Sequence, residues 1–312
     1  MSHVFGPVPS RRLGFSLGVD VIVPKTCTMD CVYCELGRTT HRTVCRSRYV
    51  DAAAVKRELE ERLSESQQLD YVTFSGSGEP TLSLDLEELV AFAAEVTDVP
   101  VAVLTNGSLL GDPAVRRALA PASLVVPSLD AVSREAFERV NRPHPSLDPG
   151  LMVDALATFR SGFRGQMWLE MLIVKDMNDD PAEIALLADA VERIQPDRVQ
   201  LGTVVRPPTE KEALPISGDR LLEIASELGP RTEVIAAPSG PSQLASRAPV
   251  VDRIVEMAAR RPVSSIDVAR VVGTSQADAA KLLDSLVREG MLELVRLGQT
   301  LYYRAYLDRE RP

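Results

Sequence analysis

Short apolar runs alternate with stretches of helical periodicity between residues 15 and 236. The apolar runs predict strands over residues 15–24, 71–75, 101–104, 124–129, 167–174, 198–205 and 232–236. The amphipathic stretches predict helices over residues 51–69, 84–96, 112–119, 147–161, 181–194 and 219–228. Repeated strand-then-helix units predict an α/β domain with a parallel sheet that curves into a full or partial barrel, a partial (β/α)6 arrangement of the TIM type.

The pattern changes after residue 236. Residues 237–249 are rich in Pro, Ser, Gly and Ala, which is typical of a linker. Three helical stretches follow, over residues 250–260, 265–272 and 275–289, and then two strands over residues 292–296 and 300–306. Three helices and a hairpin predict a winged helix-turn-helix domain over residues 250–312, separate from a barrel domain over residues 1–236.

Conspicuous polar residues follow the predicted strands. In α/β barrels the carboxyl ends of the strands build the active site, and side chains placed there by different strands meet at one edge. We therefore expect one shared site. Its members are the cysteines of residues 27–34 and Glu79, Asn106, Asp130, Lys175 and Arg206.

Three of the four cysteines lie in one short loop. Cys27, Cys31 and Cys34 are spaced C-x3-C-x2-C, and Cys45 stands apart. Zinc sites usually take four ligands from two separated pairs, and no second pair follows here. Three thiolates on a cubane iron–sulfur cluster leave one iron open to an exogenous chelator. A degenerate zinc knuckle or three buried thiols is the alternative.

Composition indicates the cell compartment in which these cysteines lie. The 312 residues carry a formal net charge of −9, and no apolar run is long enough to cross a membrane. The first residues lack the charged and apolar regions of a secretory signal. We expect a cytoplasmic protein with no membrane contact. In that reducing compartment clustered cysteines bind metal or do redox work rather than form disulfides.

Two motifs on successive strands resemble the radical S-adenosylmethionine (SAM) superfamily. The first is C-x3-C-x2-C with Tyr33 before its last cysteine. The second is Ser77-Gly78-Glu79-Pro80, similar to the superfamily's GGEP motif with Ser in place of the first Gly. The resemblance covers about residues 10–236. Residues 6–14 (GPVPSRRLG) and 33–38 (YCELGR) further resemble the wyosine-synthase-like group of small iron–sulfur oxidoreductases.

The resemblance implies a mechanism. Cys27, Cys31 and Cys34 would hold a [4Fe–4S] cluster whose open iron chelates the amino and carboxylate groups of SAM. One electron, from a donor such as flavodoxin or ferredoxin, would cleave SAM to a 5′-deoxyadenosyl radical that abstracts hydrogen from an unidentified substrate.

The same resemblance implies further SAM contacts. They are Tyr33 against the adenine, Ser77, Gly78, Glu79 and Pro80 near the ammonium, Asn106, Ser128 and Asp130 near the ribose or carboxylate, Lys175 paired with the carboxylate, and Gly202 and Val204 near the adenine.

Several of these residues have simpler explanations. Asn106-Gly107 is a common turn pair, and Ser128 and Asp130 could cap the next helix. Lys175 could be a solvated lysine. Arg206 could pair on the surface or bind substrate, and Arg11 and Arg12 could recognise an anionic substrate or be charges at the rim.

Too few cysteines remain for a second cluster. Only Cys45 lies outside the motif, and a bystander thiol is the better interpretation of it. Wyosine synthases carry additional cluster ligands. Their guanosine-and-pyruvate condensation therefore does not carry over to this chain.

The charge of the C-terminal region bears on its partners. Residues 249–312 hold ten Lys and Arg against nine Asp and Glu, a net charge of +1, which leaves −10 on the rest of the chain. The expected recognition helix mixes Lys281 and Arg288 with three acidic residues, whereas nucleic-acid readers show a basic face. We expect a docked peptide or protein, or packing against the barrel as a lid. A tRNA-modifying enzyme and a redox-sensing DNA-binding regulator are the alternatives.

Overall fold

The computed structural model describes residues 2–10, 12–65, 69–235 and 250–306. Its main sheet has eight strands in the order β1-β2-β5-β6-β7-β8-β9-β10. β1 pairs with β2 in antiparallel fashion, and all other neighbours are parallel. The strands are β1 (Val4–Ser10), β2 (Gly14–Val19), β5 (Tyr71–Phe74), β6 (Val101–Thr105), β7 (Leu124–Pro127), β8 (Gln166–Ile173), β9 (Arg198–Thr203) and β10 (Thr232–Val234). The predicted α/β fold with a parallel sheet is confirmed.

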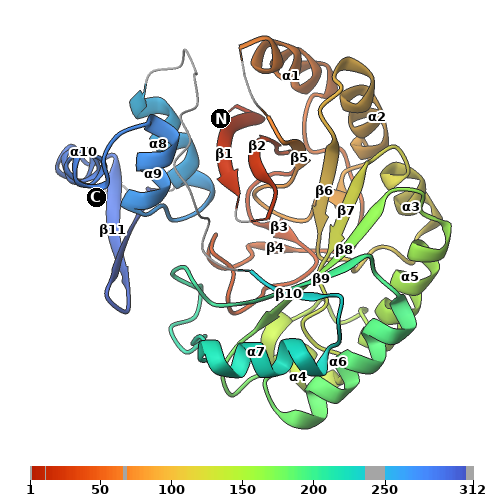
Figure 1. Cartoon of the computed structure of the whole chain (residues 1–312). Helices are drawn as coiled ribbons and strands as arrows, with labels where there is room; N and C mark the ends of the chain where they lie inside the picture. The colour runs from red at the N-terminus through yellow and green to blue at the C-terminus, as the bar shows by residue number, and fades with distance from the viewer. Residues whose placement is uncertain (1, 11, 66–68, 236–249, 307–312) are drawn as a thin grey trace.

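Helices connect the parallel strands and lie along the outside of the sheet (Figure 1). Several start where the sequence places a cap: Asp112, Asp180 and Ser217 each accept a hydrogen bond from the first turn. Apolar faces of the helices and strands form one continuous core. The helices are α1 (Ala52–Glu65), α2 (Leu86–Val96), α3 (Pro113–Leu119), α4 (Arg134–Asn141), α5 (Pro149–Gly162), α6 (Pro181–Ile194) and α7 (Gly218–Glu227).

Several features differ from the sequence-based expectation, among them one strand, one helix and the end of β2. β1 was not predicted, because Pro7 and Pro9 each remove a backbone donor and normally argue against a strand. α4 was missed because half of its eight residues are charged, although Ser133 caps it. The strand expected over residues 15–24 ends at Val19, where Asp20 begins a loop.

Residues 250–306, here called the C-terminal unit, form three helices and an antiparallel hairpin. These elements are α8 (Val250–Arg260), α9 (Ser265–Val272), α10 (Gln276–Arg288), β11 (Leu292–Leu297) and β12 (Thr300–Ala305). The unit has its own apolar core around Ile254, Leu283 and Leu286. Gly273 ends α9 in the left-handed conformation, with φ 72°. The expected three helices and hairpin are present at the predicted positions.

The C-terminal unit lies beside the first strand of the main sheet (Figure 1). Both α8 and α9 pack against β1, and Val8 of β1 contributes to the unit's core. The predicted linker over residues 237–249 lies outside the described residues. Among the helices of the described part, none combines the length and the apolar character needed to cross a bilayer.

Candidate functional site

The cysteine loop follows β2 at the carboxyl edge of the sheet. Cys27 ends a short strand, β3 (Thr26–Cys27), which pairs with β4 (His41–Arg42). The amide of Cys34 donates to the carbonyl of Cys31 at 3.1 Å, which folds the second half of the loop into a turn. All three thiols are free and half-buried, whereas Cys45 is exposed.

Two of the three sulfurs face side-chain amides from other elements. Nδ2 of Asn106, after β6, lies 3.5 Å from Sγ of Cys27 and also donates to Thr28 Oγ1 at 2.7 Å. Nδ2 of Asn141, the last residue of α4, lies 3.4 Å from Sγ of Cys31. Amide donors to cysteine sulfur are a common way for a protein to orient and tune an iron–sulfur cluster.

Glu79 is buried and organises the edge between β5 and β6. Its Oε1 accepts from Thr81 N at 3.0 Å, from Thr81 Oγ1 at 2.5 Å and from Thr105 Oγ1 at 2.6 Å. Its Oε2 accepts from Asn106 N at 2.7 Å. Glu79 also caps the 3-10 turn η1 (Pro80–Leu82). Burial raises the pKa of Glu79, and the hydrogen bonds from Thr105 and Thr81 oppose that rise.

Gly78 and Ser77 connect this motif to the cysteine loop. A Cβ on Gly78 would stand 1.9 Å from the carbonyl oxygen of Thr26, so this position requires glycine for close packing on the loop. The amide of Glu79 donates to the same oxygen at 3.1 Å. Ser77 donates through its amide (3.1 Å) and its hydroxyl (2.5 Å) to the buried carboxylate of Asp20. The motif therefore fixes the backbone from which Cys27 projects.

Asp130 joins the cysteine loop to β8. Its carboxylate accepts a short hydrogen bond from Tyr33 Oη, one from Asn141 Nδ2 at 2.7 Å and one from Leu172 N at 2.9 Å. Burial raises the pKa of Asp130 to about 6, against the effect of these hydrogen bonds. Neither Ser128 nor Asp130 caps the next helix, because Ser133 does.

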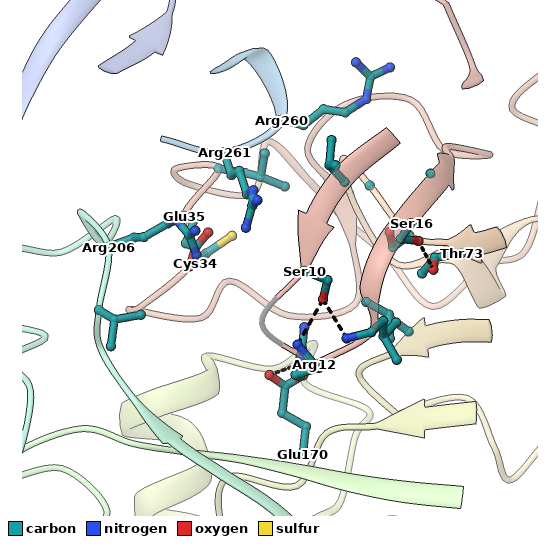
Figure 2. A pocket seen from close by; sticks show the side chains of 18 of the residues that line it. Ser10, Arg12, Ser16, Cys34, Glu35, Thr73, Glu170, Arg206, Arg260 and Arg261 are labelled. Carbon is teal, nitrogen blue, oxygen red and sulfur yellow. Dashed lines mark hydrogen bonds and ion pairs between the residues drawn. The ribbon is translucent and has the colours of Figure 1, made fainter. Parts of the chain in front are cut away.

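A cavity of about 370 Å³ opens beside the cysteine loop (Figure 2). Cys31, Tyr33 and Cys34 line one side, and Val204 lines another. A much smaller cavity, about 10 Å³, lies between Tyr33, Asn106, Ser128 and Asp130. Five of the eleven residues predicted to contact SAM line these two cavities: Tyr33, Asn106, Ser128, Asp130 and Val204.

The other predicted SAM contacts line neither cavity. Gly202 is half-buried in β9, and Pro80 is buried in η1. Lys175 is exposed and borders neither cavity; its amide donates to the carbonyl of Leu214 at 2.9 Å. Arg11 lies outside the described residues.

The two described candidate arginines both line the large cavity, and both are paired. Arg12 forms a close ion pair with Glu170, as Figure 2 shows. Arg206 is only 6% exposed and lies between Glu35 at 3.7 Å and Asp267 at 3.4 Å. The alternative that Arg206 pairs on the surface is therefore wrong.

The thiols fit an iron–sulfur cluster better than a single ion. Among the described residues, no group of three or more His, Cys, Asp or Glu is gathered closely enough to hold one metal ion. A cubane separates its ligands more widely, because each thiolate binds a different iron. Burial raises the pKa of Cys27 to about 12 and raises the pKa of Cys31 and Cys34 as well, so metal binding would have to displace these protons.

Sequence reasoning missed two buried members of this site. Asn141 belongs to the unpredicted helix α4 and bridges Cys31 and Asp130. Asp20 directly follows β2 and accepts from Ser77. Asp20 follows the observed end of the strand, but the predicted strand ran on to residue 24 and so hid this strand-end signal. Asn141 had no comparable signal, since helix ends carry asparagine for many reasons.

Comparison with known proteins gives a family match over this site. Residues 21–188 match the family model described as the Radical SAM superfamily. A UPF0026 protein of Helicobacter pylori (strain J99) is 31% identical over 309 residues, which cover 97% of each chain. A protein of Brachyspira hyodysenteriae named GTPase Obg is 42% identical over 219 residues; these are 70% of this chain but only 32% of that protein.

Solved structures agree with the family model at the level of the fold. Streptococcus suis SuiB bound to S-adenosylmethionine superposes with a TM-score of 0.52 and 16% sequence identity, over 73% of this chain and 51% of that one. Enzymes of the family use a [4Fe–4S] cluster and SAM. The chain therefore belongs to the radical SAM superfamily and is an enzyme of that superfamily.

Proposed function

We propose that Cys27, Cys31 and Cys34 hold one [4Fe–4S] cluster and that SAM binds its open iron inside the large cavity. When bound, the cluster and SAM supply a 5′-deoxyadenosyl radical that abstracts hydrogen from substrate. The observation that carries the proposal is the grouping of three free, half-buried thiols in one loop. Two of these sulfurs face amide N–H groups, and two of the cysteines line the cavity.

The chain's own residues would hold SAM beside the cysteines. Val204 and Tyr33 offer surface for the adenine, since both line the large cavity. Oε2 of Glu79 has accepting capacity beyond its bond to Asn106 N and would meet the SAM ammonium. The other proposed SAM contacts are Ser77, Gly78, Pro80, Asn106, Ser128, Asp130 and Gly202. Because it is exposed and lines neither cavity, Lys175 is the proposed SAM contact with the weakest structural support.

Arg12 and Arg206 are the proposed substrate-side cations, together with Arg11. Both described arginines line the large cavity with their carboxylate partners, Glu170 and Glu35. A buried, paired arginine still presents fixed N–H donors, so it can orient a polar group of the substrate without adding net charge.

We also propose that the chain is a partial (β/α)6 barrel over residues 1–236 with a winged helix-turn-helix domain over residues 250–312. The element order of the C-terminal unit and its separate core support the second domain. The substrate is a small molecule or a peptide. A donor such as flavodoxin or ferredoxin would deliver the electron in the cytoplasm, and the wyosine-synthase-like grouping remains part of this proposal.

Anaerobic reconstitution with iron and sulfide tests the proposal. We expect reduced, cluster-loaded protein to convert SAM to 5′-deoxyadenosine and methionine, measured by liquid chromatography, and Cys27→Ala to abolish the conversion. Cys45→Ala is the matched control and should leave it unchanged. Iron-loaded protein that never makes 5′-deoxyadenosine, yet retains DNA at moderate salt, would favour the regulator; retention and modification of tRNA would favour the tRNA-modifying enzyme.

A further inference from the structure

We propose that the C-terminal unit closes the open side of the main sheet and forms one wall of the reaction cavity, with a small molecule as substrate. The proposal rests on the proposed function for one point only, that the cavity beside the cysteine loop is where the reaction takes place. The wall itself follows from contacts between described residues.

The cavity is lined from both parts of the chain. Cys31 and Cys34 come from the cysteine loop, and Met257, Arg260 and Arg261 come from the end of α8 and the residue after it. Figure 2 shows Arg261 extending into the region that Cys34, Glu35 and Arg206 also line. The C-terminal unit thus borders the same space as two of the three proposed cluster ligands.

One edge of the main sheet holds the C-terminal unit through β1. Arg261 Nη2 donates to the carbonyl of Pro9 at 2.7 Å, and the Arg260 guanidinium lies 4.0 Å from the centre of the Phe5 ring. Beside β1, Arg62 of α1 forms an ion pair with Glu256 of α8 at 2.9 Å, and these side chains are 19% and 29% exposed. The contact is therefore apolar packing reinforced by partly buried charges.

The opposite part of the sheet holds the unit through the loop after β9. Arg206 Nε donates to the carbonyl of Pro262 at 3.1 Å, and its Nη2 lies 3.4 Å from Asp267. Tyr302 Oη donates to the carbonyl of Val205 at 2.6 Å. In the described part of the chain β1 and β10 are the unpaired edges of the sheet. A unit tied both to β1 and to the β9 loop spans the opening between them.

The lining indicates the chemical class of the substrate. Apolar side chains such as Phe5, Leu104, Leu172 and Met257 line the cavity together with four arginines and two glutamates, of which Arg12 pairs with Glu170 and Arg206 with Glu35. A cavity of this kind suits a small molecule with an apolar body and few polar groups. A tRNA or folded protein could reach the cysteines by this side only if the C-terminal unit moved away.

Alkylation of the metal-free full chain by N-ethylmaleimide tests the wall without any cluster or SAM. Peptide mass spectrometry would follow Cys31 and Cys34, with the exposed Cys45 as an internal reference. We expect Glu256→Arg, which places two like charges together, to speed alkylation of Cys34 about tenfold. The charge swap Arg62→Glu with Glu256→Arg should restore the slow rate. Asp252→Arg, an exposed reversal on the same helix, should change nothing.

A second variant is expected to slow the alkylation of Cys34 instead of speeding it. Met257→Trp adds bulk to the cavity from the side of the C-terminal unit, so we expect slower alkylation of Cys34 at an unchanged Cys45 rate. If Cys34 is alkylated in either Glu256→Arg or Met257→Trp at the same rate as in the unchanged chain, the C-terminal unit does not form a wall of the cavity. Protection of Cys34 by bulk tRNA, but not by polyglutamate, overturns the small-molecule assignment. A chain that fails to assemble a cluster would refute the proposed function while leaving these rates interpretable.

Discussion

The carboxyl edge of the main sheet and helix α10 of the C-terminal unit use their polar side chains in different ways. At the sheet edge, Glu79, Asp130 and Asn141 are at most 3% exposed. Glu79 accepts from the amide of Asn106, and Asn141 donates to Asp130 and faces Cys31. On α10 of the C-terminal unit, Lys281 and Asp278 are 79% and 59% exposed and pair only locally. Buried networks fix positions, whereas exposed pairs mainly keep a surface soluble.

This difference matches two separate roles: the sheet edge would bind the cofactors, and the C-terminal unit would enclose the cavity. The sheet edge holds the residues that would bind and orient the cofactors, and the C-terminal unit meets it through Arg206, Arg261 and Tyr302. As a wall of the cavity, the unit would contribute by where it lies rather than by a reactive group of its own.

The largest effect is expected at the cysteine loop. Replacing Cys27, Cys31 or Cys34 singly by Ser should remove cluster binding, because each thiolate would be the sole protein ligand of one iron. Iron analysis and visible absorbance after anaerobic reconstitution measure this. Cys45→Ser is the control, and equal iron content in all four variants would show that the loop is not the cluster site.

The next-largest effect is expected at the contact between the main sheet and the C-terminal unit. Arg206→Leu removes the buried cation that lies between Glu35 and Asp267, and breaking a buried pair from one side costs about 3 kcal/mol or more. Lys281→Leu breaks an exposed pair and should cost below about 1 kcal/mol. Urea unfolding of both variants measures the free energy of unfolding. Similar losses in the two variants would contradict the contrast between the regions.

Asn141→Leu should loosen the cluster without unfolding the chain. It removes the amide that faces Cys31 and Asp130, and loss of such a supporting residue typically weakens metal retention about tenfold or more. The rate of iron transfer to a chelator measures retention. Asn178→Leu is a matched control, since Asn178 bonds to backbone groups and to no sulfur. Faster iron loss in the control than in Asn141→Leu would argue against the role of Asn141.

The smallest effect concerns pH, at a position remote from the site. Hydrogen bonds from His3 and Ser2 outweigh burial and lower the pKa of Glu58 from 4.5 to about 2. A lowered folded-state pKa stabilises the fold above pH 4.5, and that contribution is lost as pH falls from 4.5 toward 2. Thermal unfolding should therefore show a weaker dependence on pH in this window for Glu58→Gln. Identical profiles for the two proteins would refute the assignment.

The sequence predicted well which residues lie at the carboxyl edge of the sheet, because a residue that follows a parallel strand is placed there. Glu79, Asn106 and Asp130 each follow a strand, so their meeting could be expected before the structure. Asn141 could not, since it reaches Cys31 from a helix 110 residues away in sequence. Arg206 was predicted at a strand end, but its burial depends on Asp267, a partner 61 residues later. β1 was missed because its prolines argue against a strand.

Electron paramagnetic resonance of the reduced, reconstituted protein tests whether Cys27, Cys31 and Cys34 hold a cluster with one open iron. A cluster held by Cys27, Cys31 and Cys34 has one iron without a protein ligand, so adding SAM should change its signal. The account predicts a [4Fe–4S] signal that shifts on SAM addition and is absent after Cys34→Ser. A signal that SAM leaves unchanged, or that survives loss of Cys34, would contradict it.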